Sequence, residues 1–170
     1  MILSSPQFAD GTELPFFCSY DAENKSPPLS WSDIPKGVAS FALTCIDQTD
    51  PANTWTHWLI WNIPGTETFL PEGMGQYPQL DNGIRQGPNN FFELGWGGPC
   101  PPNGKHLYVF NLYALDCLLD ASFRTIHELR AALTGHVLDI AELSAVMESE
   151  KPMVSWERLR EGYGAYNGIR

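Results

Sequence analysis

Positively charged residues are scarce in this chain, and their scarcity excludes several classes of partner. The 170 residues include 10 Lys+Arg against 20 Asp+Glu, which gives a formal net charge of -10 at pH 7. Binding to nucleic acid or to an anionic membrane surface relies on clustered positive charge. We therefore expect no nucleic-acid partner, and we expect any bound phospholipid to be held as a single headgroup.

Long apolar runs are absent as well. A membrane-spanning helix needs about 20 predominantly apolar residues in a row, and this chain has no such run. The segment from Met1 to Gln7 also lacks the basic residues and the apolar core of a secretory signal. These features predict a cytoplasmic protein without membrane insertion.

Cysteine is rare too. The chain has 4 Cys, namely Cys18, Cys45, Cys100 and Cys117, and their spacing is not paired. Three of them lie in apolar contexts that are typical of reduced, buried thiols. The cysteine spacing predicts neither a disulfide nor a zinc site, and we expect no cofactor.

Glycine, proline and aromatic residues are abundant instead. The composition of 15 Gly, 14 Pro and 12% aromatic residues favours short strands and turns over a helical bundle. The length suits one hydrophobic core, so we expect a single domain over residues 1–150. Residues 151–170 form a C-terminal extension. Its Trp, Leu and Tyr residues predict that it docks on the domain or on a partner subunit.

The apolar and β-branched runs predict strands near residues 12–19, 40–47, 56–63 and 105–116. The stretch 64–104 is long for a connection, so it should contain short strands or a functional loop.

The pattern becomes helical after Asp116. Thr125 and Glu128 form a capping box, and Gly135 stands where that helix should end. We expect a second helix from Val137 to Glu148. The predicted fold class is thus mostly β, with two C-terminal helices.

Four polar side chains lie at or near the ends of the predicted strands. Asp47 ends one strand, and His57 lies near the start of the next. His106 and Tyr108 share a face of the strand 105–116, because side chains two residues apart point the same way. Binding sites are commonly built on loops that a rigid sheet positions. We therefore predict a pocket with one carboxylate, two imidazoles and a phenol, in which both imidazoles can bind an anion as imidazolium.

A stiff loop precedes His106 and forms the expected rim of this pocket. Pro101 and Pro102 fix their own φ angles and favour extended geometry before them. The glycines at 95, 97 and 98 let the backbone approach a ligand closely. Proline and glycine together predict a rigid, close-fitting rim.

The same residues also have a purely structural interpretation. His57, which is flanked by tryptophans, is typical of a core histidine with a backbone partner, and Tyr108 is typical of a buried aromatic residue. We interpret His127 and His136 as structural, and Asp116 as the residue that closes a strand. The combination of carboxylate, imidazoles and phenol is what favours a binding site.

Several motifs, in this order, resemble the phosphatidylethanolamine-binding protein family, and most closely its bacterial, Raf-kinase-inhibitor-like branch. They are the segment Asn24 to Trp31, the acid Asp47, the pair His57-Trp58, and the Gly-Pro-Cys-Pro-Pro run that is followed by His106-x-Tyr108. The resemblance extends from about Pro6 to about Met147. It implies an antiparallel, Greek-key β-sandwich.

The resemblance also implies a small cavity that binds phosphate, a phospholipid headgroup or another small anionic or zwitterionic ligand. The positions that match the family's pocket are Asp47, His57, Pro101, Pro102, His106 and Tyr108. Some family members inhibit a kinase or a protease, and bacterial relatives often form homodimers. Both properties are expectations for this chain.

The chain departs from the family's acidic and arginine positions at five places. These are Thr49, Pro88, Asn90, Glu93 and Leu107. The departures make the rim of the cavity less cationic, which bears directly on its affinity for an anion.

A metal-dependent hydrolase is the alternative. His57, His106 and Asp47 are a ligand set found in catalytic metal sites. The sequence has no His-x-His or His-Glu-x-x-His spacing, however, and no nucleophile-elbow motif. We therefore interpret the chain as a binding protein rather than an enzyme.

Overall fold

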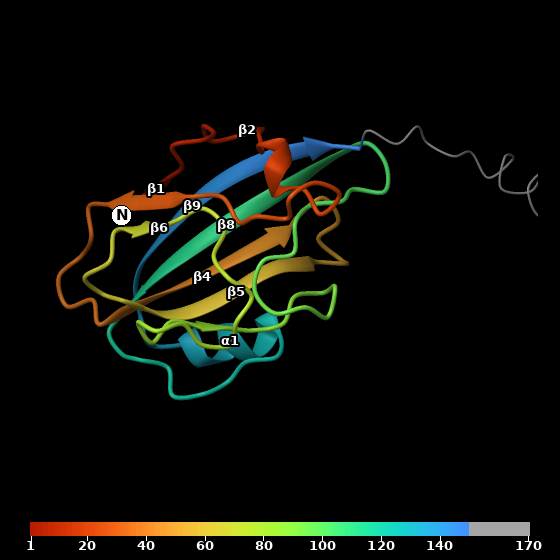
Figure 1. Ribbon diagram of the computed structural model, residues 1–170. Coiled ribbons are helices and arrows are strands. Elements are labelled where there is room, and N and C mark those ends of the chain that lie inside the picture. Colours follow the sequence, from red (N-terminus) through yellow and green to blue (C-terminus); the bar gives the residue numbers. More distant parts are fainter. Residues whose placement is uncertain (150–170) are drawn as a thin grey trace, which may run out of the picture.

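The computed structural model describes residues 1–149, so the predicted extension at 151–170 lies outside the described residues. A six-stranded sheet forms the centre of the fold (Figure 1). Its strands, in spatial order, are β2 (Thr12–Glu13), β9 (Val137–Glu148), β8 (Lys105–Leu115), β4 (Ser40–Asp47), β5 (Trp55–Pro64) and β7 (Arg85–Gln86). Neighbouring strands are antiparallel except for β2 and β9, which are parallel.

A smaller sheet and a helix cover the two faces of the central sheet. The smaller sheet has the order β1 (Ile2–Ser4), β3 (Leu29–Ser32) and β6 (Phe69–Leu70). Its residues Leu3 and Trp31 pack in one buried cluster with Phe41 of β4. The helix α1 (Ile126–Leu133) lies against the opposite face (Figure 1). The predicted mostly β fold is therefore confirmed.

The central strands form because their side chains are apolar on both faces. In β4, Phe41 and Leu43 point into the cluster beneath the smaller sheet, whereas Ala42 and Ile46 point toward α1. Burying a Phe, Leu or Ile side chain contributes roughly 1.5–3 kcal/mol. The predicted strands 40–47, 56–63 and 105–116 correspond to β4, β5 and β8.

Helix α1 begins and ends where the sequence predicts. The Thr125 hydroxyl accepts a hydrogen bond from the Glu128 amide at 3.2 Å, and Gly135 takes a φ of 84° just after the helix. The buried residues Ile126, Leu129 and Leu133 hold the helix on the sheet.

The second predicted helix is wrong, because Val137–Glu148 is the long strand β9. Buried residues alternate along it at Ala141, Leu143, Ala145 and Met147, which is the two-residue period of a strand rather than the period of a helix. β9 pairs with β8 from Lys105 to Leu115. Pairing with the buried strand β8 thus outweighs the helix preference of the residues between the apolar positions.

The predicted strand 12–19 is only partly correct. Thr12–Glu13 forms the short strand β2, but Phe16–Cys18 forms a 3-10 helix, η1, after Pro15. All four cysteines are free thiols. Within residues 1–149, no helix has the length and apolar character needed to cross a membrane.

Candidate functional site

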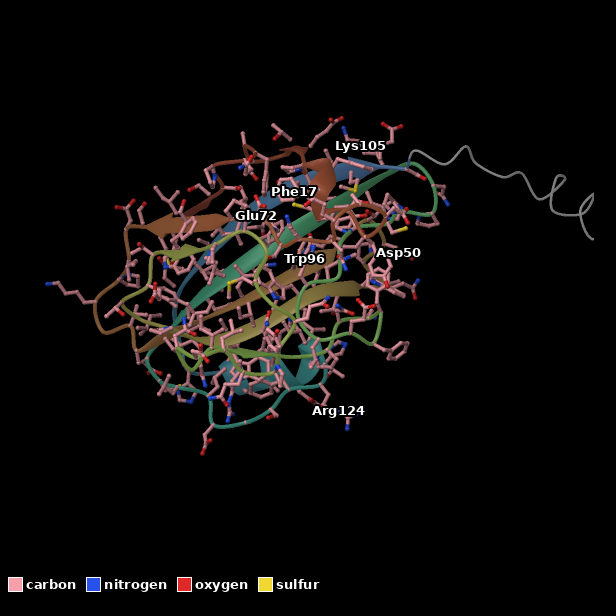
Figure 2. The ribbon with its side chains drawn as sticks, in the orientation of Figure 1. Phe17, Asp50, Glu72, Trp96, Lys105 and Arg124 are labelled. Carbon is pink, nitrogen blue, oxygen red and sulfur yellow. The ribbon has the colours of Figure 1, made fainter. Side chains whose placement is uncertain are left out.

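The ends of three neighbouring strands meet at one edge of the central sheet. In the antiparallel register, Asp47 at the end of β4 pairs with Trp55 at the start of β5 and with Tyr108 near the start of β8. These strand ends lie together at the right of Figure 1, and Asp50, just beyond β4, is labelled at the same side in Figure 2. The edge brings together residues that are far apart in the sequence.

A cavity of about 640 Å³ lies at this edge. All six residues singled out from the sequence line it: Asp47, His57, Pro101, Pro102, His106 and Tyr108. The other lining residues are Thr49, Asp50, Asn53, Trp55, Phe91, Cys100 and Asn103.

A β-bulge sets the direction of the His57 side chain. Cys45 pairs with Trp58 and Ile46 pairs with Thr56, so His57 is the extra residue in β5. Its ring centroid lies 5.1 Å from that of Tyr108. Regular alternation would place consecutive residues on opposite faces, but a bulge redirects a side chain. His57 therefore reaches the cavity although the adjacent Trp58 also points into the core on this side of the sheet.

His57 is buried and neutral. Its Nδ1 lies 2.6 Å from the Gly97 carbonyl oxygen, so Nδ1 carries the hydrogen and donates it. Burial lowers the pKa of His57 from 6.5 to about 4, since a charged imidazolium is poorly solvated there. The lowered pKa argues against the expectation that His57 binds an anion as imidazolium near neutral pH. Its Nε2 is left as a hydrogen-bond acceptor.

His106 is paired with Asp47. The His106 Nδ1 and the Asp47 Oδ2 lie 2.6 Å apart, and both side chains are partly buried. Burial raises the pKa of Asp47, but hydrogen bonds from His106 and the Thr49 amide outweigh burial and hold that pKa below its ordinary value. Asp47 is thus an ionised acceptor that orients the His106 ring and supports a positive charge on it. The second ring nitrogen, Nε2, stays available to a ligand.

Tyr108 supplies a protonated hydroxyl to the same cavity. Its side chain is buried, and burial raises the pKa of the phenol well above its ordinary value. The hydroxyl keeps its hydrogen at every physiological pH and can donate it to a ligand oxygen.

The proline rim is held by the loop that precedes it. The Gly98 amide donates to the Asn24 side-chain oxygen at 2.7 Å, and the Pro99 carbonyl accepts from the Ser19 hydroxyl at 3.1 Å and the Tyr20 amide at 3.0 Å. A side chain at Gly98 would lie 2.1 Å from the Cys18 carbonyl oxygen. The glycine is therefore required by the close approach of two backbone segments.

An aromatic wall closes one side of the cavity, and sequence reasoning missed it. Phe91 stacks on Tyr20, with ring centroids 4.6 Å apart, and meets the edge of Trp55 at 5.5 Å. Trp55 keeps 41% of its surface exposed. The available signal in the sequence was the position of Trp55, two residues before His57 at the start of an aromatic, β-branched run.

The cavity carries more negative than positive charge. The pKa of Asp50 is lowered chiefly by a hydrogen bond from Asn53, so Asp47 and Asp50 are both ionised. No Lys or Arg belongs to the described lining, and Lys105 lies on the opposite face of β8 from His106. With His57 neutral, the His106 ring is the one lining group that can become cationic.

Four of the five positions that depart from the family pattern make hydrogen bonds at or beside this site. The Thr49 hydroxyl accepts a hydrogen bond from the Leu107 amide at 2.8 Å. Glu93 accepts from the Tyr20 hydroxyl at 2.9 Å and so fixes the ring on which Phe91 stacks. Asn90 accepts from the Thr56 amide. Pro88 comes two positions before Asn90 and forms an isolated bridge with Leu94.

The geometry does not favour the alternative metal site. Within residues 1–149, the ligand atoms of Asp47, His57 and His106 do not converge within 4.8 Å of one another. Both Nδ1 atoms already hydrogen-bond, one to Gly97 and one to Asp47. These three side chains are thus arranged to make separate hydrogen bonds rather than to share one metal ion.

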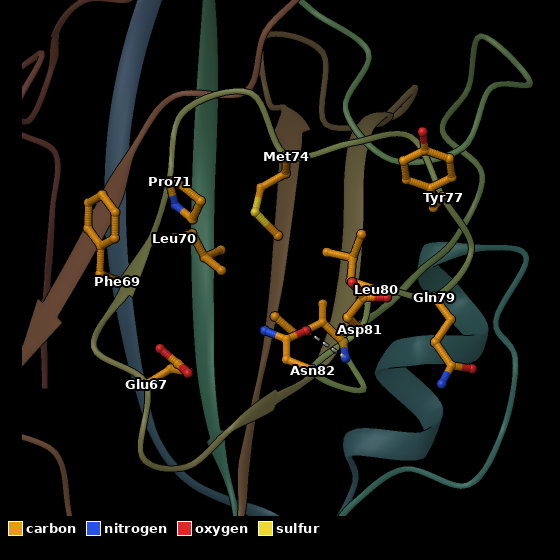
Figure 3. A pocket seen from close by; sticks show the side chains of 11 residues that line it. Glu67, Phe69, Leu70, Pro71, Met74, Tyr77, Gln79, Leu80, Asp81 and Asn82 are labelled. Atoms are coloured by element: carbon orange, nitrogen blue, oxygen red, sulfur yellow. Dashed lines mark hydrogen bonds between the residues drawn. The ribbon is translucent and has the colours of Figure 1, made fainter.

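A second hollow, of about 720 Å³, lies beside β6 and has different chemistry (Figure 3). Phe69, Leu70 and Pro71 line one side, and Met74 and Leu80 lie across from them. No imidazole or thiol lines it. Among the lining residues of the two hollows, imidazoles lie only in the cavity at Asp47.

Comparison with known proteins points to one family. The family model described as phosphatidylethanolamine-binding protein matches residues 4–148. A UPF0098 protein of Methanothermobacter thermautotrophicus is 44% identical over 147 residues, which cover 84% of this chain and 95% of that protein.

Two solved structures are similar as well. One is a phosphatidylethanolamine-binding protein homologue, CT736, from Chlamydia trachomatis, with a TM-score of 0.77, 34% identity, and coverage of 87% of this chain and 97% of that one. The other is Escherichia coli YbcL, described as a new member of the mammalian PEBP family. It has a TM-score of 0.79, 32% identity, and coverage of 86% and 97%.

Proposed function

Because this chain belongs to the phosphatidylethanolamine-binding protein family, we propose that it binds a small zwitterion carrying a phosphate and an ammonium group. Phosphorylethanolamine, free or as a phospholipid headgroup, has this chemistry. The proposed ligand lies in the cavity formed by Asp47, His57, Pro101, Pro102, His106 and Tyr108 and is not turned over.

The phosphate group would bind at the floor of the cavity. Protonated His106, held by Asp47, can donate from Nε2, and the Tyr108 hydroxyl can donate beside it, since their ring centroids are 6.5 Å apart. Hydrogen bonds from charged donors are stronger than neutral ones. The Asn103 amide lines the same cavity and adds a neutral donor.

The ammonium group would bind nearer the mouth. Asp50 is ionised, and the exposed ring of Trp55 and the ring of Phe91 offer aromatic faces. A cation is attracted both to a carboxylate and to an aromatic face. This side of the cavity complements an amine as the floor complements a phosphate.

The single observation that carries the proposal is the charge of the cavity lining. Two ionised carboxylates face one imidazole that can become cationic, and no described lining residue is Lys or Arg. Such a pocket repels a simple anion more than it repels a zwitterion. We therefore favour the zwitterion over inorganic phosphate.

Titration calorimetry with phosphorylethanolamine, inorganic phosphate and ethanolamine tests this proposal. We expect phosphorylethanolamine to bind more tightly than either fragment, and His106→Ala to weaken it at least about tenfold because a charge-assisted donor is lost. His127→Ala, on the exposed side of α1, is the matched control. No binding by the wild type, or tighter binding of phosphate alone, would refute the proposal.

Binding without turnover is a separate part of the proposal. The family match supports a ligand binder. Among the described residues that line the cavity, no three His, Cys, Asp or Glu side chains converge as metal ligands. Phosphorus NMR of phosphorylethanolamine incubated with the protein should show an unchanged spectrum. Appearance of inorganic phosphate that His106→Ala abolishes would identify an enzyme instead.

A regulatory role in the cytoplasm, as a homodimer that inhibits a kinase or a protease, is the finer part of the proposal and rests on the family resemblance. Affinity capture with wild type and His106→Ala, together with light scattering, tests it. A partner kinase or protease that the wild type retains and the variant does not would tie the pocket to regulation. If neither a kinase nor a protease is recovered, the proposed regulatory role is refuted.

A further inference from the structure

Three metal-ligating side chains converge at the end of β8 that is remote from the ligand cavity. Asp116 and Cys117 follow β8 directly, and His136 directly precedes β9. One ligand atom from each side chain lies within 4.8 Å of the other two. β8 spans eleven residues, and a strand rises about 3.3 Å per residue. The cluster is therefore separated from the ligand cavity by the length of the sheet (Figure 1).

The backbone holds these side chains together without any ligand. The Asp116 amide donates to the His136 carbonyl at 3.1 Å, which extends the pairing of Leu115 with Val137. The Cys117 carbonyl accepts a hydrogen bond from the Ser40 hydroxyl on β4. The cluster is thus fixed by strands on both sides, and little rearrangement is needed to bind a metal.

The donor set and its spacing suit one class of metal. Zn²⁺ takes thiolate, imidazole and carboxylate ligands at about 2.0–2.3 Å in tetrahedral geometry, which sets neighbouring ligand atoms about 3.3–3.7 Å apart. His136 Nδ1 and Asp116 Oδ1 are already 2.9 Å apart. A thiolate ligand selects zinc over calcium or magnesium.

The exposure of the cluster leaves one side open. The side chains of Asp116 and His136 are about half exposed, whereas Cys117 is partly buried. Three protein ligands on one side and solvent on the other match a zinc ion whose fourth ligand is water.

We propose that Asp116, Cys117 and His136 form a Zn²⁺ site that fastens the connection through α1 to the end of the sheet. On binding, the Cys117 thiol releases its proton to solvent and the sulfur bonds to zinc. The hydrogen on His136 Nδ1 moves to Nε2, so Nδ1 can coordinate while the imidazole stays neutral. Asp116 exchanges its hydrogen bond for a metal bond, and no redox change occurs.

The sequence does not predict this site, because its ligands are separated by nineteen positions and joined only through strand pairing. Cys117 and Asp116 are neighbours, but neither belongs to a paired-cysteine motif. The earlier structural interpretation of His136 and Asp116 is compatible with the metal-free hydrogen bond between them. The partly buried Cys117 thiol beside that pair is the observation that favours a metal site.

Titration of the reduced, metal-free, full-length protein with Zn²⁺ and with Co²⁺ tests the proposal. We expect one strong Zn²⁺ equivalent and a thiolate-to-cobalt absorption band. Cys117→Ser should abolish that band, and both it and His136→Ala should weaken Zn²⁺ binding at least about tenfold, as loss of a ligand does. Melting temperatures without metal establish that the variants are folded.

Three control variants locate the metal. Cys100→Ser and His106→Ala alter the ligand cavity, and His127→Ala removes an exposed imidazole on α1. All three should bind Zn²⁺ as the wild type does. Absence of Zn²⁺ binding, or binding that survives both Cys117→Ser and His136→Ala, would overturn the proposal and leave an exposed histidine–aspartate pair.

Discussion

The His106 Nδ1 lies 2.6 Å from the Asp47 Oδ2, and this contact joins two strands whose residues are fifty-nine positions apart. It settles which ring nitrogen of His106 faces the cavity, because the donated hydrogen occupies Nδ1. It also places an ionised carboxylate where it stabilises a positive charge on the ring. His106 is therefore the imidazole at which the cavity can carry a positive charge, and the register of β4 and β8 fixes the position of its ring.

Asp47→Asn should weaken the binding of phosphorylethanolamine by about tenfold or more, because a hydrogen bond to a charged group is worth about 1.5–3 kcal/mol. The amide is similar in size to the carboxylate but does not stabilise imidazolium. Calorimetry at neutral pH measures the change. Asp81→Asn, at the second hollow, should bind as the wild type does, and equal losses in both variants would mean that the effect is not local.

His57 should make the fold sensitive to acid. Its pKa is about 4 in the folded protein against 6.5 as an ordinary value, so between these values the unfolded chain binds a proton that the folded chain excludes. The free energy of unfolding is then highest above pH 6.5 and falls as pH drops toward 4, by about 3 kcal/mol from this residue. Urea denaturation at several pH values measures the loss.

The matched variant for this test is His57→Asn, which keeps a donor for the Gly97 carbonyl but does not titrate. Its stability should change less between pH 6.5 and pH 4 than that of the wild type. His127→Ala should retain the full wild-type dependence, because His127 lies on an exposed part of α1. The same slope in wild type and His57→Asn would show that other groups cause the acid sensitivity.

Local patterns predicted the strands that carry the site. β4 is a mostly apolar run that ends in Asp47, and the alternation in β8 correctly places His106 and Tyr108 on one face. The proline rim was recognisable because proline and glycine restrict the backbone directly. These features depend on residues that are near one another in the chain.

Features that depend on distant pairing were not predicted. β9 was expected to be a helix, because its alternation is interpretable only once β8 is available as a partner. The β-bulge that turns His57 toward the cavity depends on the register with β4, and nothing in the local sequence states that register. The neutrality of His57 follows in turn from burial by Phe91 and Trp96, which come from a remote loop.

Gly98→Ala should damage the rim and, through it, the cavity. The added carbon would lie 2.1 Å from the Cys18 carbonyl oxygen, so the loop must move and lose its contacts with Ser19 and Tyr20. We expect a lower melting temperature and about tenfold weaker ligand binding, since a displaced loop forfeits hydrogen bonds worth about 1 kcal/mol each. Gly104→Asn is the control, because that position has open space and asparagine tolerates its φ of 59°. Equal losses in Gly98→Ala and Gly104→Asn would show that the close packing of Gly98 against Cys18 is not what the cavity requires.

Asp50→Asn should separate the two halves of the proposed ligand. Removing this carboxylate takes away an attraction for the ammonium group and, at the same time, a repulsion of the phosphate. Affinity for phosphorylethanolamine should therefore fall, whereas affinity for inorganic phosphate should rise, each by a few fold in an exposed, screened position. Asp81→Asn changes the net charge of the protein equally and controls for long-range electrostatics. Calorimetry at two salt concentrations distinguishes local from general effects. If both ligands weaken together, Asp50 supports the structure of the cavity rather than recognising an amine, and the ligand's positive group must lie elsewhere.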